Sequence, residues 1–184
     1  VSTAPNTGVV GGLDGASATY WRNHAHTGIQ TGTAGTLAQA METGWRRCIK
    51  NGGSPNFILA GGKFIDAYRK EIVVTNQANA GQVKTLDAGV GSGVNTGLYF
   101  KGVEIIWDPQ FEELDALTTP TVEWEKRCYF INTQFFKLRP IQGHWMVPRQ
   151  PPRVYDRYVH YWGLTSKAAL TTGKRNAHAV ISIA

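Results

Sequence analysis

A chain of 184 residues, 42% hydrophobic and 17% charged, is long enough to bury a core, which excludes fibrous and disordered proteins. Its longest apolar runs, at Phe57 and Ala179, are far shorter than the roughly 20 residues that cross a bilayer, so we expect a soluble protein. The net charge of +6 is uneven: residues 120–184 hold ten Lys and Arg against three Asp and Glu, whereas residues 1–119 hold nine against ten. A basic half attracts polyanions without sequence preference, and it equally suits contacts between subunits or a solvated face.

Residues 1–35 are rich in Gly, Thr, Ser and Asn around a polar aromatic patch at 18–26, which predicts an extended chain or a hairpin arm. Val1 stands where an initiator Met is expected and no signal pattern follows, so we expect a processed or partial product. His24 and His26 alternate within the patch and could bind a metal from one side of an extended segment. Two imidazoles make an incomplete site, so structural or interface histidines are expected instead.

A helix is predicted from residue 36 to about residue 50, because apolar residues recur at helical spacing, at Leu37, Met41, Trp45, Cys48 and Ile49. Thr36 and Gln39 form a capping-box pattern at its start, and the sequence Asn-Gly-Gly at 51–53 ends it. Gly44 inside the helix costs roughly 1 kcal/mol relative to Ala, which predicts close packing against another backbone.

A buried strand at Phe57–Ala60 and a second helix are predicted next, the helix from an apolar stripe at Phe64, Ile65, Tyr68 and Ile72. The turn between them, residues 61–63 (Gly-Gly-Lys), invites a phosphate-binding interpretation, since helix N-terminal amides hold phosphates. The full motif fails, because Phe57 occupies the place of its first Gly and Phe64 the place of its Mg-binding Ser or Thr. We therefore expect a tight strand-to-helix turn, and a long mobile loop at residues 75–97.

Strands are predicted for most of the chain after residue 97. An alternating run at Val103–Trp107 stops at Pro109, an acidic loop follows at residues 112–115, and the last strand runs from about Ala177 to Ile183. The acidic residues could supply paired carboxylates or a cation site, but a charged surface loop is expected. Their contrast with the basic C-terminal part suits head-to-tail contact between identical subunits.

A strand pair is predicted at Tyr129–Arg139 and His144–Val147, with residues 141–143 as its turn. The proline-rich segment Pro148–Arg153 is expected to form a stiff corner before a further strand at Val154–Leu164.

The remaining titratable residues complete no catalytic constellation. Cys48 and Cys128 lie 80 positions apart and show no metal-binding spacing, so free buried thiols are expected, although a disulfide between them stays open. His144, His160 and His178 are isolated within strand patterns, where ordinary hydrogen-bonded positions suffice. We expect no cofactor and no bound metal.

Six segments in this order resemble the major capsid proteins of tailed bacteriophages, whose shared fold is named after phage Hong Kong 97. The resemblance covers nearly all of the chain. The segments are Gly11–Asn23 (similar to the exit of the family's extended loop), Leu37–Lys50 (its spine helix), Pro55–Ile72 (its first strand-helix unit), Leu98–Pro109 and Cys128–Pro140 (two successive aromatic strands), and Arg157–Ala184 (the closing strand with its return).

The resemblance implies an α+β subunit with the Hong Kong 97-like fold. Residues 1–35 would be the end of an extended loop or arm, partly flexible, and residues 36–53 the spine helix of a peripheral domain. Residues 54–140 would form an axial domain with a mixed sheet and helices, and residues 141–184 would return to complete the peripheral domain. The family's N-terminal arm and most of its extended loop would be lacking.

The resemblance also implies a function. The chain would be a structural major capsid protein of the virion, not an enzyme, assembled in the host cytoplasm without contact to a membrane. Its copies would form hexamers and pentamers of an icosahedral shell around double-stranded DNA, which they contact without reading its sequence. Scaffolding, portal and decoration proteins are further candidate partners.

Aromatic residues and Arg are enriched at the cores of interfaces, and basic residues attract DNA phosphates. On this basis the candidate intersubunit or DNA-facing residues are Trp21, Arg22, Arg46, Arg47, Glu112, Glu113, Arg149, Arg153, Arg157, Lys174 and Arg175.

Two alternatives stay open. The shell protein of a bacterial encapsulin-type nanocompartment shares the same fold and differs in its cargo. An enzyme with a phosphate-type ligand at residues 61–63 is the other, less favoured one.

Overall fold

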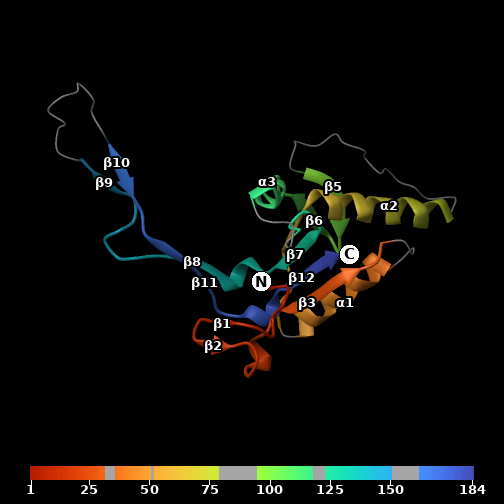
Figure 1. Ribbon diagram of the computed structural model, residues 1–184, viewed down its shortest axis with the longest axis horizontal. Coiled ribbons are helices and arrows are strands. Elements are labelled where there is room, and N and C mark those ends of the chain that lie inside the picture. The colour runs from red at the N-terminus through yellow and green to blue at the C-terminus, as the bar shows by residue number, and fades with distance from the viewer. Residues whose placement is uncertain (32–35, 51, 79–94, 118–122, 151–161) are drawn as a thin grey trace. The chain divides into compact units, whose positions relative to one another are not determined.

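The structure, a computed structural model, describes residues 1–31, 36–50, 52–78, 95–117, 123–150 and 162–184. The chain divides into two compact units, one made of residues 1–133 with 174–184 and the other of residues 134–173 (Figure 1). Within the described part of the chain, every helix is too short or too polar to span a bilayer.

The first unit is built on a mixed six-stranded sheet. Its strands are β3 (His24–Ile29), β4 (Phe57–Ala60), β5 (Asn95–Phe100), β6 (Val103–Trp107), β7 (Arg127–Ile131) and β12 (Ala179–Ile183). They lie in the order β3-β12-β7-β4-β6-β5 (Figure 1). Strands β3 and β12 run parallel, as do β4 and β6, and the other neighbours are antiparallel. With the helices that pack on it, this sheet confirms the predicted α+β class.

Side chains alternate along the strands, so the sheet has two apolar faces. The first packs on α1 (Thr36–Lys50) and α2 (Gly62–Ala78), and its fully buried members include Ile58, Phe130 and Ile181 from the sheet with Leu37, Met41 and Phe64 from the helices. The second packs on α3 (Gln110–Leu117), through Phe111 against Tyr129 and Val180. Both predicted helices and the strands predicted at 57–60, 103–107 and the C-terminus are confirmed.

An aromatic cluster occupies the centre of the larger core. The ring of Trp45 on α1 meets Phe100 and Phe130 edge-on, with centroids 5.8 and 5.7 Å apart, and the two phenylalanine rings stack at 5.8 Å. Such pairs contribute roughly 1 kcal/mol each beyond the burial of their surface. The cluster joins α1 to strands β5 and β7 of the sheet.

The start of α1 is held by a carboxylate from α2. Glu71, only 8% exposed, accepts hydrogen bonds from the backbone N–H groups of Leu37 at 3.1 Å and Ala38 at 3.0 Å. A negative charge beside free N–H groups at a helix N-terminus is stabilising. The sequence pattern at Thr36 and Gln39 predicts the start of this helix, but nothing near it in sequence indicates Glu71.

Gly44 lies where α1 crosses the sheet. A Cβ atom on it would meet Ile181 Cδ1 at 3.5 Å, His26 Cδ2 at 3.7 Å and Ala179 Cβ at 3.8 Å. The prediction of close packing is confirmed, but the neighbours are side chains and not another backbone. All three distances are ordinary van der Waals separations, so the helix does not need a glycine here.

We therefore expect Gly44→Ala to stabilise the chain by up to about 1 kcal/mol, because alanine removes the helix penalty of glycine without a clash. The free energy of unfolding in urea checks this. A loss of stability beyond about 1 kcal/mol would contradict the described spacing between α1 and the sheet.

The N-terminal segment contributes more to the first unit than its composition indicates. A hairpin does form, from β1 (Val9–Val10) and β2 (Leu13–Asp14). The following strand, β3, is however a member of the central sheet, parallel to β12 at its edge. Its residues are mostly polar or small, so no apolar pattern indicated this place.

Two further segments differ from the expectation. Residues 75–78 continue α2 and residues 95–97 begin β5, so these ends of the predicted mobile loop are regular structure, and residues 79–94 lie outside the described residues. Strands β5 and β6 form a hairpin through Lys101 and Gly102, whose φ angles of 51° and 81° are those of a type I′ turn.

The described residues of the second unit form two antiparallel strand pairs. Strand β8 (Phe136–Pro140) pairs with β11 (Ala168–Thr172), and β9 (Val147–Arg149) pairs with β10 (Gly163–Thr165) (Figure 1). Both pairs join residues far apart in sequence.

The predicted pairing of Tyr129–Arg139 with His144–Val147 is wrong. A 3-10 turn at Thr133–Phe135 divides the first segment into β7 and β8, which belong to different sheets. A turn does form at residues 141–143, where His144 N–H donates to Ile141 O at 3.0 Å. It connects β8 to β9 without pairing them. Of the predicted proline-rich corner, Pro148 and Arg149 belong to the paired strand β9, and residues 151–153 lie outside the described residues. Residues 154–161 of the strand expected after it also lie outside them, and its end overlaps β10.

Candidate intersubunit surface

The β8–β11 pair, called the ribbon below (Phe136–Pro140 with Ala168–Thr172), has two chemically different faces. The register sets Leu138 opposite Leu170, and side chains alternate along each strand. One face therefore carries Phe136, Leu138, Pro140, Ala168, Leu170 and Thr172. The other carries Lys137, Arg139, Ala169 and Thr171. The ribbon is apolar on the first face and cationic on the second.

The apolar face is bare. Leu138 is 57% exposed and Leu170 is 68% exposed, although the two lie directly opposite each other. A two-stranded ribbon is marginally stable alone, and contiguous exposed apolar surface marks a site of contact. Covering each leucine would contribute about 1.5 to 3 kcal/mol.

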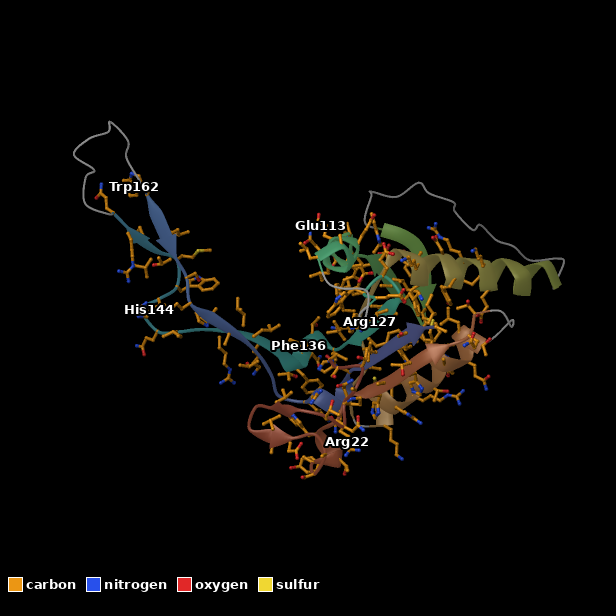
Figure 2. All side chains as sticks on the ribbon, viewed as in Figure 1. Arg22, Glu113, Arg127, Phe136, His144 and Trp162 are labelled. Carbon is orange, nitrogen blue, oxygen red and sulfur yellow. The ribbon has the colours of Figure 1, made fainter. Side chains whose placement is uncertain are left out.

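The β9–β10 pair continues the same character. Trp162, immediately before β10, is 73% exposed and Leu164 is 64% exposed, while Trp145 and Met146 on the other side are also exposed. Phe136, His144 and Trp162 mark the course of this unit in Figure 2. Large apolar side chains of the described residues thus remain in water along both strand pairs.

Positive charge is concentrated in the same unit. The sequence of residues 134–173 holds six Lys and Arg against one Asp, so this part of the chain carries most of the net charge of +6. Its described residues include Lys137, Arg139, Arg149 and Lys167 and no Asp or Glu. Such a surface attracts an anionic partner.

The acidic segment at 112–115 is a helix and not the predicted loop. Asp108 accepts a hydrogen bond from Gln110 N–H at 3.0 Å, and Pro109 fills the first turn, which is a common start of a helix. Asp115 accepts from the N–H groups of Trp124 and Glu125. This carboxylate therefore holds the following chain in place and is not available as part of a cation site.

The other two acidic residues face outward. Glu112 and Glu113 are exposed on α3, and Figure 2 shows Glu113 at the surface of this helix. Leu117, one turn after Glu113, is 83% exposed, and Leu114 is 37% exposed. The helix thus presents acidic and apolar side chains together.

Arg175 is not a surface residue. It is 4% exposed, and its Nε–H donates to Asn23 Oδ1 at 3.1 Å, while Asn23 itself is buried. Burial lowers the pKa of this guanidinium. The expectation that Arg175 faces a partner or DNA does not fit this position, whereas the neighbouring Lys174 is half-buried.

Arg22 and Trp21 have a local role in the first unit. Arg22 donates from Nε to Gly15 O at 2.6 Å and from Nη2 to Ala16 O at 2.8 Å, which ties the N-terminal hairpin region to the chain before β3. Trp21 is half-buried. Arg22 is therefore occupied by contacts within the chain.

Three predicted arginines are exposed. Arg46 pairs with Glu42 at 2.9 Å along α1, Arg47 lies 3.4 Å from His26 Nε2, and Arg149 donates to Thr165 Oγ1 at 3.2 Å across the β9–β10 pair. Arg153 and Arg157 lie outside the described residues. The described members of the predicted set are thus distributed over both units.

The turn at Gly61-Gly62-Lys63 is filled by the chain itself. Phe64 N–H at the start of α2 donates to Glu125 O at 3.1 Å, and Gly61 N–H donates to Arg127 O at 3.0 Å. Lys63 Nζ pairs with the Glu125 carboxylate at 2.7 Å. A phosphate would have to displace this carbonyl and this carboxylate. The expected tight turn is confirmed.

Both cysteines are free and fully buried, as expected. Burial raises the pKa of Cys48 to about 12 and also raises the pKa of Cys128, so neither thiol is a nucleophile near neutral pH. The described residues contain no group of three or more His, Cys, Asp or Glu that could hold a metal. Burial, together with the charge of Arg47, lowers the pKa of His24 and of His26.

His178 gives the fold a pH dependence. Its side chain is 1% exposed and its Nδ1 accepts from Asn132 N–H at 3.1 Å, and burial lowers its pKa to about 4. An unfolded histidine binds a proton near pH 6.5, so unfolding takes up a proton between pH 6.5 and 4. We expect the free energy of unfolding to fall as pH falls through this window, by roughly 2 kcal/mol at pH 4.5.

Urea titrations of the chain and of His178→Asn at pH 7 and pH 4.5 check this. The variant lacks the imidazole, so its pH-dependent loss should be smaller by that amount. Equal losses in both chains would contradict the assignment to His178.

The predicted site residues did not include the most exposed apolar side chains, which are Leu117 in the first unit and Leu138, Trp162, Leu164 and Leu170 in the second. One signal was available. The sequence Phe-Lys-Leu-Arg-Pro at 136–140 alternates apolar and basic residues, which is typical of a strand with two different faces.

Comparison with known proteins gives a structural match. No family model matches the sequence, and no curated protein matches it. Among solved structures, the chain is similar to a chain of the cyanophage A-1(L) capsid asymmetric unit, with a TM-score of 0.59 and 14% identity. The match covers 97% of this chain and 56% of that chain, so this chain spans little more than half of its structural neighbour's length. The chain has a phage capsid-like fold.

Proposed function

We propose that this chain is a structural major capsid protein with the Hong Kong 97-like fold, whose copies form hexamers and pentamers of an icosahedral shell around double-stranded DNA. The observation that carries the proposal is the ribbon, whose Leu138 and Leu170 are 57% and 68% exposed. A subunit that works alone gains nothing from such a face, whereas a subunit of a shell buries it against its neighbours. The capsid-like fold supports the same conclusion.

Sequence-independent contact with DNA accords with the charge distribution. Arg149 and Lys167 lie in the second unit outside the ribbon strands. Such side chains bind phosphates without reading bases. We propose that Arg149 and Lys167 hold DNA and that Arg175 does not.

The domain assignment is carried forward as part of the proposal. The spine helix of the peripheral domain would be α1, the axial domain would take most of residues 54–140, and residues 141–184 would return to the peripheral domain. The packing of β12 beside α1 supports the return of the chain to this helix. In the structure, however, β4, β5, β6 and β7 share one sheet and one core with α1, and the division into units falls after residue 133.

The encapsulin-type shell differs from a phage head in what it encloses, so the contents of native particles decide between them. Particles purified from the source are treated with nuclease, opened, and assayed for protected DNA and for cargo protein. Protected double-stranded DNA is the expected result. Particles with an enzyme cargo and without DNA would favour the nanocompartment.

The phosphate-binding enzyme is disfavoured by the occupied turn at residues 61–63. Titration of the chain with nucleotides in a calorimeter should give no binding heat. Saturable heat that is lost in Lys63→Ala would revive this function.

A further inference from the structure

We infer that the outer face of α3 in one copy docks on the apolar face of the ribbon in a second copy. This inference rests on the proposed function, because it specifies how identical subunits meet. The two surfaces differ, so the contact is head to tail. Each copy then offers one helix and one ribbon, and a chain of such contacts closes into a ring or extends.

The outer face of α3 combines apolar and acidic groups. Phe111 and Asp115 lie one turn apart and hold the helix to its own unit. Phe111 packs against Tyr129 and Val180, and Asp115 accepts hydrogen bonds from the backbone N–H groups of residues 124 and 125. Glu113 and Leu117, also one turn apart, lie on the opposite side of the helix. Leu117 is 83% exposed, more than any other large apolar side chain of the described residues.

The ribbon offers the complementary chemistry. Its apolar face presents Leu138 and Leu170 directly opposite each other, both exposed. Lys137 and Arg139 leave from the other face of β8, which among the described strands pairs with β11 alone. Their long aliphatic stems allow the ammonium and guanidinium groups to pass the unpaired edge of β8 and to reach the border of the apolar face. Cations thus border an apolar patch, as carboxylates border Leu117.

A nucleic acid is a poorer occupant of this surface. Phosphates would pair with Lys137 and Arg139 but would leave Leu138 and Leu170 largely in water, because a charged and hydrated sugar-phosphate backbone covers little apolar surface. The α3 surface satisfies both requirements at once. The described residues of the second unit also include no Asp or Glu that would repel the carboxylates of α3.

Cross-linking between singly substituted copies tests the docking. Copies with Leu117→Cys are mixed with copies with Leu170→Cys, assembled, and treated with a short thiol cross-linker. The native Cys48 and Cys128 are buried and do not compete. Cross-linked dimers are expected in the mixture and not with either variant alone. In the control mixture, copies with Tyr99→Cys take the place of copies with Leu117→Cys. Tyr99 lies on β5 and is 62% exposed, so its thiol is equally accessible, but no dimer with Leu170→Cys is expected.

Charge reversal provides a second measurement. Glu112→Lys with Glu113→Lys should reduce assembly, and so should Lys137→Glu with Arg139→Glu, in sedimentation velocity without DNA. A mixture of the two doubly reversed chains should recover assembly, because each now offers the charge that the other lacks.

Each outcome decides. Dimers in the mixture and recovery on mixing support the docking. Normal assembly without a 117–170 cross-link overturns the docking and leaves the proposed function standing. A chain that carries both Leu117→Cys and Leu170→Cys is also treated at high dilution. If the cross-link forms only within this single chain, the ribbon contacts the helix of its own chain and not that of a second copy, which overturns the inference. Loss of DNA binding in the ribbon variant, without any loss of assembly, would assign the ribbon to nucleic acid. Failure of the unsubstituted chain to assemble removes the proposed function itself.

Discussion

Gly61→Ala is expected to destabilise the chain by about 3 kcal/mol or more, the largest effect among single methyl additions. A Cβ atom at this position would lie 2.5 Å from Glu125 Cα and even closer to the Glu125 carbonyl oxygen. Both are backbone atoms and cannot rotate away. To make room, the turn would have to break the hydrogen bonds to Arg127 O and Glu125 O that seat β4 and α2.

The adjacent glycine is the matched control. A Cβ atom on Gly62 would meet only Trp107 Nε1, at 3.7 Å, so Gly62→Ala should change stability by less than about 1 kcal/mol. Urea unfolding of both variants measures the difference. If Gly61→Ala were as stable as Gly62→Ala, residues 61–63 would not be packed against Glu125, and a ligand loop there would again be open.

Replacing both ribbon leucines by serine, Leu138→Ser with Leu170→Ser, is expected to abolish assembly while leaving the first unit folded. Both side chains are exposed in the single chain, so their loss costs little there. At a contact where both are buried, the loss is about 3 kcal/mol, which lowers the association constant roughly a hundredfold. Sedimentation velocity over a range of concentrations measures this shift.

The matched control places two serines on the other face of the same strand pair. Ala169→Ser with Thr171→Ser keeps the ribbon and its charges and should assemble as the unsubstituted chain does. Unchanged assembly of the double leucine variant would show that the apolar face is not a subunit contact. Circular dichroism and urea unfolding confirm that each variant keeps the first unit intact.

The sequence predicted those elements whose periodicity is strong and local. The apolar stripes of α1 and α2 and the runs at β4, β6 and β12 are such cases, and the free cysteines followed from their spacing. Strand β3 was not predicted as a sheet strand, because its His, Thr and Gly residues lack an alternating apolar pattern. The acidic residues at 112–115 predict a loop, although Asp108 and Pro109 in the same sequence are a helix-start signal for α3.

Pairing between distant segments was the main feature that could not be predicted. Strand β8 pairs with β11 across about thirty residues, and the sequence of neither strand indicates which strand it pairs with. The carboxylate of Glu71 at the start of α1 is equally non-local. For the same reason Arg175, basic and near the C-terminus, was expected at the surface, whereas Asn23 from the other end of the chain holds it in the interior.

The candidate surface was predicted in its chemistry but not in its residues. Opposite charges in the two halves of the sequence indicated head-to-tail contact, and α3 and the ribbon unit carry those charges. The sequence does not indicate that these leucines are exposed, because an apolar residue in a strand is expected to be buried. Only the structure distinguishes Leu138, which is bare, from Ile58, which is fully buried.

Self-association of the chain is the most direct test of a capsid role. Purified chain is examined by sedimentation velocity and by electron microscopy across a wide range of protein concentration. Ordered assemblies, rings or closed shells, that dissociate in the Leu138→Ser and Leu170→Ser variant are the predicted result. A monomer of 20.2 kDa at every concentration, with the ribbon intact, would contradict it.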